Sequence, residues 1–365
     1  MLFRLGEHIV PPLGRTRIYV CGITPYHTTH VGHAATFVWV DTLARVLEHV
    51  GVSVELCRNV TDVDDDLLAE ARRRQLGWRE LATQQASGFE EDMRKLHVRR
   101  PDLEPQSRDY VTDVVFMTRA LLDRDAAYER EGWVYFRGAD VPGRLGLGRD
   151  EALALAAEGG GRTDDPRPDD PLDVVLWQPS AAGEPAWASP WGDGRPGWHV
   201  ECSAMVTSVL GLAVDVHAGG ADLAFPHHAY EAAIAEAATG VAPFARAWLH
   251  VGTVHLGGRK MAKSTGNLVF VDDLLRRWPA AAVRYLILDR DWAEPWEFDE
   301  SDLAGAAERV ERLWSRGAEA GDDEVAAREV ARSLVEGLDT RRALAVADEG
   351  GGGAARLATR LLALS

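Results

Sequence analysis

Four residues of the chain have side chains of the types that bind zinc. His227 and Glu231 are four positions apart in a segment with a helical pattern, so both side chains can lie on one helix face. Cys202 lies in the helical segment before them, and Cys21 ends a short β-forming apolar run. Two thiolates, one imidazole and one carboxylate suit a tetrahedral zinc site. Because buried cysteines are often only small hydrophobic residues, spacing alone leaves that alternative open.

Cys57 and His228 are two further residues of types that bind metals. Cys57 lies in the middle of an expected strand without a ligand-type neighbour, so we interpret it as a buried hydrophobic residue. His228 is either a support for the metal ligands or a structural histidine, and the sequence leaves both open. Three widely spaced cysteines do not form a disulfide framework, and they favour a cytoplasmic protein with a metal or a reactive thiol.

A second cluster with chemical potential is His30-Val31-Gly32-His33. It follows the β-forming run 17–20 and begins an apolar-periodic segment, 34–50, which predicts a strand, a turn and a helix N-terminus. Free backbone N–H groups and the positive end of the helix dipole make such a place an anion site. Gly32 would let a flat ligand approach, and the imidazoles could donate hydrogen bonds to phosphate oxygens. Taken alone, the cluster is equally compatible with an ordinary polar turn.

A third cluster is a glycine-led loop at 257–264 that carries Lys260 and Lys263. Lysine occurs elsewhere only at Lys95, although arginine is abundant, so these two positions require a compact and flexible charge. Mobile ammonium groups suit the transient stabilisation of charge on transferring phosphates. The alternative for the loop taken alone is a solvated basic turn.

The elements that must position these residues alternate between strand and helix. Strand 17–20, helix 34–50, strand 53–59 and a helix from the capping sequence 61–65 to about residue 76 predict a parallel, doubly wound sheet. Its ligand crevice would lie at the carboxyl ends of the strands. After an insertion the pattern resumes with helix 199–210, strand 213–217, helix 225–239 and an apolar strand, 251–256.

The fold class we predict is α/β, with a Rossmann-like sheet, a mainly helical insertion and a helical C-terminal domain. The expected domains are 1–94 for the first half of the catalytic domain, 95–195 for the insertion, 196–271 for the second half with its lysine loop, and 272–365 for the helical domain.

Composition excludes several classes of protein. The net charge of -17 over 365 residues argues against a broad nucleic-acid-binding face. No window is apolar enough for a transmembrane span, and the N-terminus lacks a signal-peptide pattern, so we expect a cytoplasmic protein.

Together the motifs resemble the class I aminoacyl-tRNA synthetases of the cysteinyl type. His30-Val31-Gly32-His33 is similar to the HIGH signature of that family, and 260–264 to its KMSKS signature, with Ala262 in place of a serine. Segments 195–205 and 225–228 are nearly verbatim for the cysteinyl group. Within the family, the resemblance is nearest to the cysteine ligases of the mycothiol pathway. It covers essentially the whole chain, and this nearest likeness rests on segments 22–26, 170–173, 176–177, 266–271 and 338–344.

The resemblance implies a reaction in two steps. ATP and L-cysteine form cysteinyl-adenylate and pyrophosphate, and the amine of glucosaminyl-inositol then attacks the activated carbonyl to form an amide. It also implies one Zn²⁺ per chain, held by Cys21, Cys202 and His227, and ATP as co-substrate with Mg²⁺. The cysteine thiolate would take an open position on the zinc, which explains selection of cysteine over serine. Glu231 at the fourth ligand position resembles the tRNA synthetase rather than the ligase.

The remaining site residues are carried over in the same way. Asp222, in Gly220-Ala221-Asp222, would hold the substrate ammonium, and Trp198 would pack against the carbon skeleton of the substrate. His30 and His33 would contact the phosphates, and Lys260 and Lys263 the departing pyrophosphate. The residues that would line the substrate and the adenylate also include Cys21, Gly22, Ile23, Thr24, Thr36, Asn59, Val60, Thr61 and Val254.

Departures from the pattern leave alternatives open. His27 replaces an aspartate, and segment 158–161 matches only part of the corresponding ligase segment, so the chain could load cysteine onto another small amine. A truncated cysteinyl-tRNA synthetase is disfavoured by the acidic charge and by the roughly one hundred residues after Lys263, too few for an anticodon-binding end. A catalytically inactive binding module is disfavoured by the intact histidines and lysines. We therefore expect no tRNA partner, and a monomer.

Overall fold

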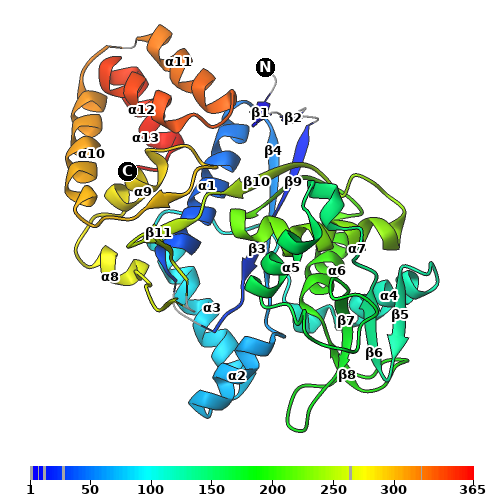
Figure 1. Cartoon of the computed structure of the whole chain (residues 1–365). Helices are drawn as coiled ribbons and strands as arrows, with labels where there is room; N and C mark the ends of the chain where they lie inside the picture. The colour runs from blue at the N-terminus through cyan, green and yellow to red at the C-terminus, as the bar shows by residue number, and fades with distance from the viewer. Residues whose placement is uncertain (1–2, 7, 11–13, 27–28, 263–264, 322) are drawn as a thin grey trace.

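A four-stranded parallel sheet forms the centre of the computed structural model, which describes residues 3–6, 8–10, 14–26, 29–262, 265–321 and 323–365. Figure 1 shows this sheet between a C-terminal group of helices and a second lobe built from the middle of the chain. The strand order is β10-β9-β3-β4, with bounds β3 Arg15–Ile23, β4 Ser53–Val60, β9 Val214–Gly220 and β10 Ala245–Val251.

Side-chain alternation along β3 determines which residues meet on each face of the sheet. Ile18 and Val20 belong to the hydrophobic core that contains helix α1 (Val31–His49). Tyr19 and Cys21 belong to the core on the opposite face, with helices α6 (Trp198–Leu210) and α7 (Ala229–Thr239). Parallel sheets are normally covered on both faces, and successive residues of a strand point to opposite faces. Cys21 is therefore directed toward α6 and α7.

The strand order reverses between β3 and β9. From β3 the chain crosses through α1 to β4 on one side, whereas β9 and β10 lie on the other side. A reversal of this kind opens a crevice at the carboxyl ends of the two strands, which is where doubly wound sheets bind ligands. The His30 motif follows β3, and Asp222 follows β9, so both lie at this edge.

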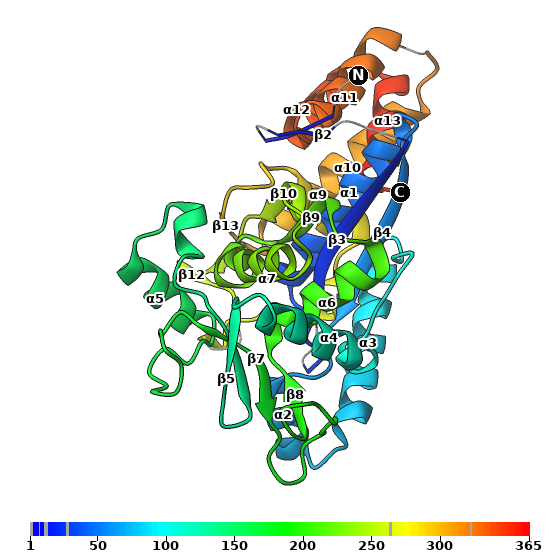
Figure 2. The same cartoon turned by 90° about the vertical axis from the view of Figure 1, so that its right-hand side faces the viewer.

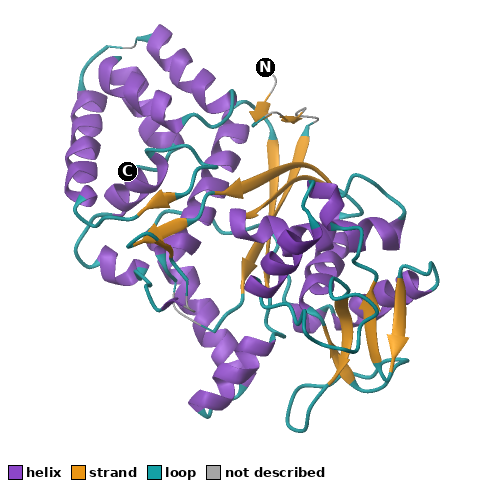
Figure 3. Ribbon diagram, in the orientation of Figure 1, coloured by secondary structure: helices purple, strands orange, loops and turns teal. Residues whose placement is uncertain are grey.

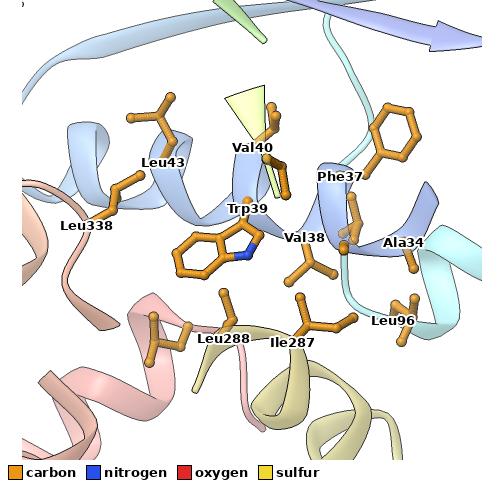
Figure 4. Close-up of a cluster of buried hydrophobic side chains, with 14 of the residues drawn as sticks. Ala34, Phe37, Val38, Trp39, Val40, Leu43, Leu96, Ile287, Leu288 and Leu338 are labelled. Carbon is orange, nitrogen blue, oxygen red and sulfur yellow. The ribbon is translucent and has the colours of Figure 1, made fainter. Parts of the chain in front are cut away.

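Helix α1 is buried along most of its length because it lies between the sheet and the C-terminal helices (Figure 4). Trp39 and Val38 point toward Ile287 and Leu288 of α9 (Ala280–Leu288) in that view. The remaining helices of this lobe are α8 (Val271–Leu275), α10 (Asp302–Ala318), α11 (Glu324–Val335), α12 (Thr340–Glu349) and α13 (Gly352–Leu361). The Ala-, Glu- and Arg-rich pattern of about 300–365 predicts helices, and α10 to α13 confirm it.

The middle of the chain forms the second lobe, seen from the side in Figure 2. It combines helices with an antiparallel sheet of order β5-β6-β7-β8, as the orange strands of Figure 3 show. The short apolar segments 134–137 and 174–178 predict β6 and β7, whereas β5 and β8 were not predicted. The bounds in this lobe are α4 Val111–Leu122, α5 Arg149–Glu158, β5 Ala127–Arg130, β6 Trp133–Phe136, β7 Val174–Pro179 and β8 Gly194–Pro196. Helices α2 (Asp65–Arg74) and α3 (Trp78–Lys95) follow β4, and α3 packs in the core that contains α1.

Two further expectations need correction. The strand predicted at 251–256 is two strands, β10 ending at Val251 and β11 (Val254–Leu256), because β10 is the edge of the parallel sheet while β11 pairs with β12 (Arg259–Lys260) and β13 (Trp296–Glu297). Before the first predicted strand the sequence favours a loop or a weak strand, and the structure has a pair of short antiparallel strands there, β1 (Phe3–Leu5) and β2 (His8–Val10). Among the described residues, no helix has both the length and the apolar character needed to cross a membrane.

Candidate functional site

The four residues predicted to bind zinc meet in the crevice. One ligand atom from each of Cys21, Cys202, His227 and Glu231 lies within 4.8 Å of the others, and all four side chains are buried. Cys21 comes from the end of β3, Cys202 from α6, and Glu231 from the first turn of α7. Zinc bonds of about 2.0–2.3 Å arranged tetrahedrally require ligand separations of this order. The donor set and its geometry therefore fit a tetrahedral zinc ion.

Contacts within this cluster favour the ionised forms of Cys202 and Glu231 but not of Cys21. Hydrogen bonding from Cys21 lowers the pKa of Cys202 to about 6, although burial opposes the shift. Burial also opposes ionisation of Glu231, but the nearby His227 and His217 hold the pKa of that carboxyl below its usual range. Burial raises the pKa of the Cys21 thiol, which lies 3.4 Å from Glu231 Oε2. A buried cation would reverse that last shift, since coordination deprotonates a thiol.

Asn59 connects the cluster of predicted zinc ligands to the edge of the sheet. Its Oδ1 accepts a 2.8 Å hydrogen bond from the Gly22 amide, and its Nδ2 donates to Thr61 Oγ1 and to Cys202 Sγ. Gly22 is required here because a Cβ would lie 1.7 Å from the Asn59 carbonyl oxygen. The residues that the resemblance assigned to the adenylate thus begin next to the predicted zinc ligands. Ile23, Thr36, Val60 and Val254 are also buried, whereas Thr24 is partly exposed.

Two side chains hold the imidazole of His227 in place. His227 Nδ1 lies 2.9 Å from His199 Nδ1, so its Nε2 is left for the metal cluster, 3.6 Å from Glu231 Oε2. Trp198 stacks on the same ring at a centroid distance of 4.1 Å. A hydrogen bond to the other ring nitrogen fixes the tautomer of a ligating histidine. His199 lies within segment 195–205 and carries no sequence signal of this role.

A second group of possible ligands shares two members with the first. Ligand atoms of His217 and His228 lie within 4.8 Å of one another and of Cys21 and Glu231. His217 Nε2 is 3.3 Å from Glu231 Oε2, and His228 Nδ1 lies 2.9 Å from a ring nitrogen of His250. Sequence reasoning left His228 undecided and missed His217. The available signal for His217 was strand alternation on β9, which places it on the face opposite its neighbours Val216 and Ala218, where its ring meets Tyr19 and Phe244.

The histidine motif begins α1, with His30 as its N-cap. The Gly32 amide donates to His30 Nδ1 at 3.1 Å, and the Val31 amide donates to the Val269 carbonyl at 3.0 Å. The expectation that free amides converge here is therefore wrong for these two groups, because the motif's own imidazole and the segment after the lysine loop satisfy them. The rings of His30 and His33 stack at 3.8 Å. Any recognition of phosphate by this motif depends on the imidazoles rather than on these amides.

The lysine loop reaches the crevice from β11 and β12. Lys260 Nζ lies 2.8 Å from Asp222 Oδ2, which joins the two clusters that the sequence treats separately. Asn267 Nδ2 donates to the carbonyl oxygens of Leu256, Arg259 and Lys260, and this fixes the base of the loop. Lys263 and His27 lie outside the described residues.

These features together define a class of protein: a doubly wound α/β domain that combines a Cys/Cys/His/Glu centre with a histidine motif and a lysine loop. A family model described as "tRNA synthetases class I (C) catalytic domain" matches residues 11–308. The chain belongs to this family. The Mycobacterium tuberculosis methionyl-tRNA synthetase in complex with methionyl-adenylate has the same fold, with a TM-score of 0.66 at 15% identity over 96% of this chain and 82% of that one.

The curated proteins that resemble this chain carry two kinds of name. The L-cysteine:1D-myo-inositol 2-amino-2-deoxy-alpha-D-glucopyranoside ligase of Thermomonospora curvata is 45% identical, covering 91% of this chain and 82% of the relative. The ligase of that name from Frankia casuarinae is 46% identical over 82% of this chain and 66% of the relative. The cysteine–tRNA ligase of Syntrophobacter fumaroxidans is 41% identical, but this chain covers only 63% of it.

Proposed function

We propose that the chain is an ATP-dependent ligase of mycothiol biosynthesis that joins L-cysteine to the amine of glucosaminyl-inositol. The observation that carries this proposal is the 45% identity to the Thermomonospora curvata ligase over 91% of this chain. The buried thiol-containing metal cluster supports it, because a thiophilic centre in the crevice suits a substrate with a thiol.

The proposed reaction balances in two steps. The carboxylate oxygen of cysteine attacks the α-phosphorus of ATP, and the bond to pyrophosphate breaks. The neutral amine of the acceptor then attacks the acyl carbon, AMP leaves, and the nitrogen loses a proton. Cys21, Cys202, His227 and Glu231 would hold a zinc ion, which would supply a Lewis acid for the substrate sulfur.

The other site residues would bind and orient the reactants. Asp222 would receive the cysteine ammonium, and the stacked imidazoles of His30 and His33 would donate hydrogen bonds to the ATP phosphates. Lys260 and Lys263 would neutralise charge on the departing pyrophosphate, where bound Mg²⁺ would assist. Trp198, which stacks on His227, would border the substrate pocket. Gly22, Thr24, Asn59 and Thr61 would line the adenylate.

The experiment is product analysis by mass spectrometry with the enzyme, L-cysteine, ATP and glucosaminyl-inositol, without tRNA. We expect cysteinyl-glucosaminyl-inositol and AMP in equal amounts. Cysteine-dependent release of pyrophosphate without that product would contradict the acceptor and point to another amine. Transfer of cysteine to tRNA in a parallel assay would instead favour the cysteine–tRNA ligase activity of the Syntrophobacter relative.

A further inference from the structure

The contact between Lys260 and Asp222 joins two residues that the proposed reaction uses for different substrates. Their charged atoms, Nζ and Oδ2, are 2.8 Å apart. In the proposed function Asp222 receives the cysteine ammonium, and Lys260 meets the phosphates of ATP. The Lys260 ammonium, at hydrogen-bond distance from Asp222 Oδ2, therefore occupies the position where the ammonium of cysteine would bind. The same contact holds the lysine away from the phosphates.

The backbone around Lys260 and the backbone around Asp222 both position this ion pair. The Lys260 carbonyl accepts hydrogen bonds from Asn267 Nδ2 at 3.2 Å and from Thr265 Oγ1 at 3.3 Å, so the start of the loop is fixed while the side chain extends toward β9. On the other side, Asp222 Oδ1 lies against Gly220, where a Cβ would be only 2.4 Å away. The absence of a side chain at Gly220 lets the Asp222 carboxylate occupy this position.

We propose that the Lys260–Asp222 ion pair couples the cysteine site to the ATP site. When the ammonium of cysteine binds Asp222, it breaks the ion pair and frees Lys260 to bind ATP. When the phosphates of ATP bind Lys260, they break the same ion pair and free Asp222 to bind cysteine. Each substrate thereby strengthens the binding of the other, whichever arrives first, because a coupling free energy between two sites is reciprocal. This inference rests on the proposed function and deepens it.

The size of the coupling follows from the exposure of the pair. The side chains of Lys260 and Asp222 are 36% and 39% exposed, so the ion pair is partly screened by water. Pairs of this kind contribute little, which corresponds to a change in affinity of about two- to fivefold. A contact this weak can be displaced by either substrate.

The test is isothermal titration calorimetry of zinc-loaded enzyme with cysteine, with and without the non-hydrolysable ATP analogue AMPCPP. For the wild type we expect AMPCPP to tighten cysteine binding about two- to fivefold. For Lys260→Met we expect cysteine alone to bind about as tightly as it binds the wild type with AMPCPP, and we expect no further effect of the analogue.

Two controls separate the ion pair from other effects. Lys95→Met removes a lysine whose pair with Asp272 has similar exposure, 36% and 34%, and it should leave the coupling unchanged. The cysteine analogue 3-mercaptopropionate has no ammonium, so neither AMPCPP nor Lys260→Met should tighten its binding. Two outcomes would overturn this inference but leave the proposed function standing. The first is that Lys260→Met binds cysteine no more tightly than the wild type does without AMPCPP. The second is that AMPCPP still tightens cysteine binding in Lys260→Met. Absence of any thiol binding by the wild type would overturn the proposed function and the inference with it.

Discussion

At the scale of single residues, the three cysteines differ by their neighbours rather than by their burial. Cys21, Cys57 and Cys202 are all buried. Burial raises the pKa of Cys57 to about 12, whereas the thiol of Cys21 lowers the pKa of Cys202 to about 6. Only the thiolate binds metals well, so Cys202 is prepared for coordination and Cys57 is not. The sequence interpretation of Cys57 as a hydrophobic residue agrees with its place in the core.

Replacing Cys202 with alanine should therefore remove zinc. We expect Cys202→Ala to retain much less than one zinc per chain after dialysis, because a tetrahedral site loses one of its thiolates. Cys57→Ala is the matched control, and it should retain zinc as the wild type does. Metal content measured by inductively coupled plasma mass spectrometry checks both. Equal loss of zinc in the two variants would contradict the assigned ligands.

At the scale of elements, α2 shows how local sequence signals produced a correct boundary. The helix begins after Asp64, whose Oδ1 accepts hydrogen bonds from the amides of Asp66 and Leu67, as the capping sequence predicted. The structure also shows that the Asp64 carboxylate is buried, which makes its ionised form unfavourable. Burial raises the pKa of Asp64 to about 6, and the neighbouring acidic residues contribute.

The pH dependence of Asp64→Asn tests this cost. The carboxyl has a higher pKa in the folded chain than its ordinary 3.8, so its ionisation destabilises the fold above pH 6, and stability recovers as the pH falls toward 4. Asparagine caps a helix about as well and carries no charge. We expect the variant to be more stable than the wild type at pH 8 by about 1–2 kcal/mol. The difference should shrink at pH 4.5, as measured by urea unfolding; a less stable variant at pH 8 would refute the argument.

At the scale of the whole molecule, one buried guanidinium ties the C-terminal helices to the sheet domain. Arg284 of α9 is fully buried and donates hydrogen bonds to Asp41 of α1 and to the carbonyl oxygens of Leu96 and Leu362. Leu96 follows the end of α3 and Leu362 follows the end of α13, so α1, α3, α9 and α13 meet at this one side chain. The hydrophobic core that contains α1 also includes residues of α9 to α13.

Removing this guanidinium should destabilise the chain strongly. We expect Arg284→Ala to lower the free energy of unfolding by about 3–5 kcal/mol, because the buried Asp41 carboxylate loses its fully buried cation and keeps Arg45, whose side chain is 30% exposed, as a charged partner. Arg276→Ala removes an exposed arginine from a helical pair with Asp272 and should cost less than about 1 kcal/mol. Urea unfolding followed by circular dichroism measures both. Similar costs for the two variants would show that the buried pair does not hold the lobes together.

The sequence by itself determined the residue types and the order of elements. The helix cap at Asp64, the apolar periodicity of 34–50 and the motifs at His30 and Lys260 are local signals, because each depends on neighbours a few positions away. These signals, with the resemblance they carry, sufficed for the α/β fold class and the family.

The tertiary structure decided which of these residues meet. The approach of Cys21 to Glu231, the hydrogen bond of the Val31 amide to Val269 and the ion pair of Lys260 with Asp222 join segments that are far apart in the chain. Their partners are set by the reversal of strand order between β3 and β9 and by side-chain packing against both faces of the sheet. No local pattern specifies such contacts, because they exist only once the distant segments have packed together.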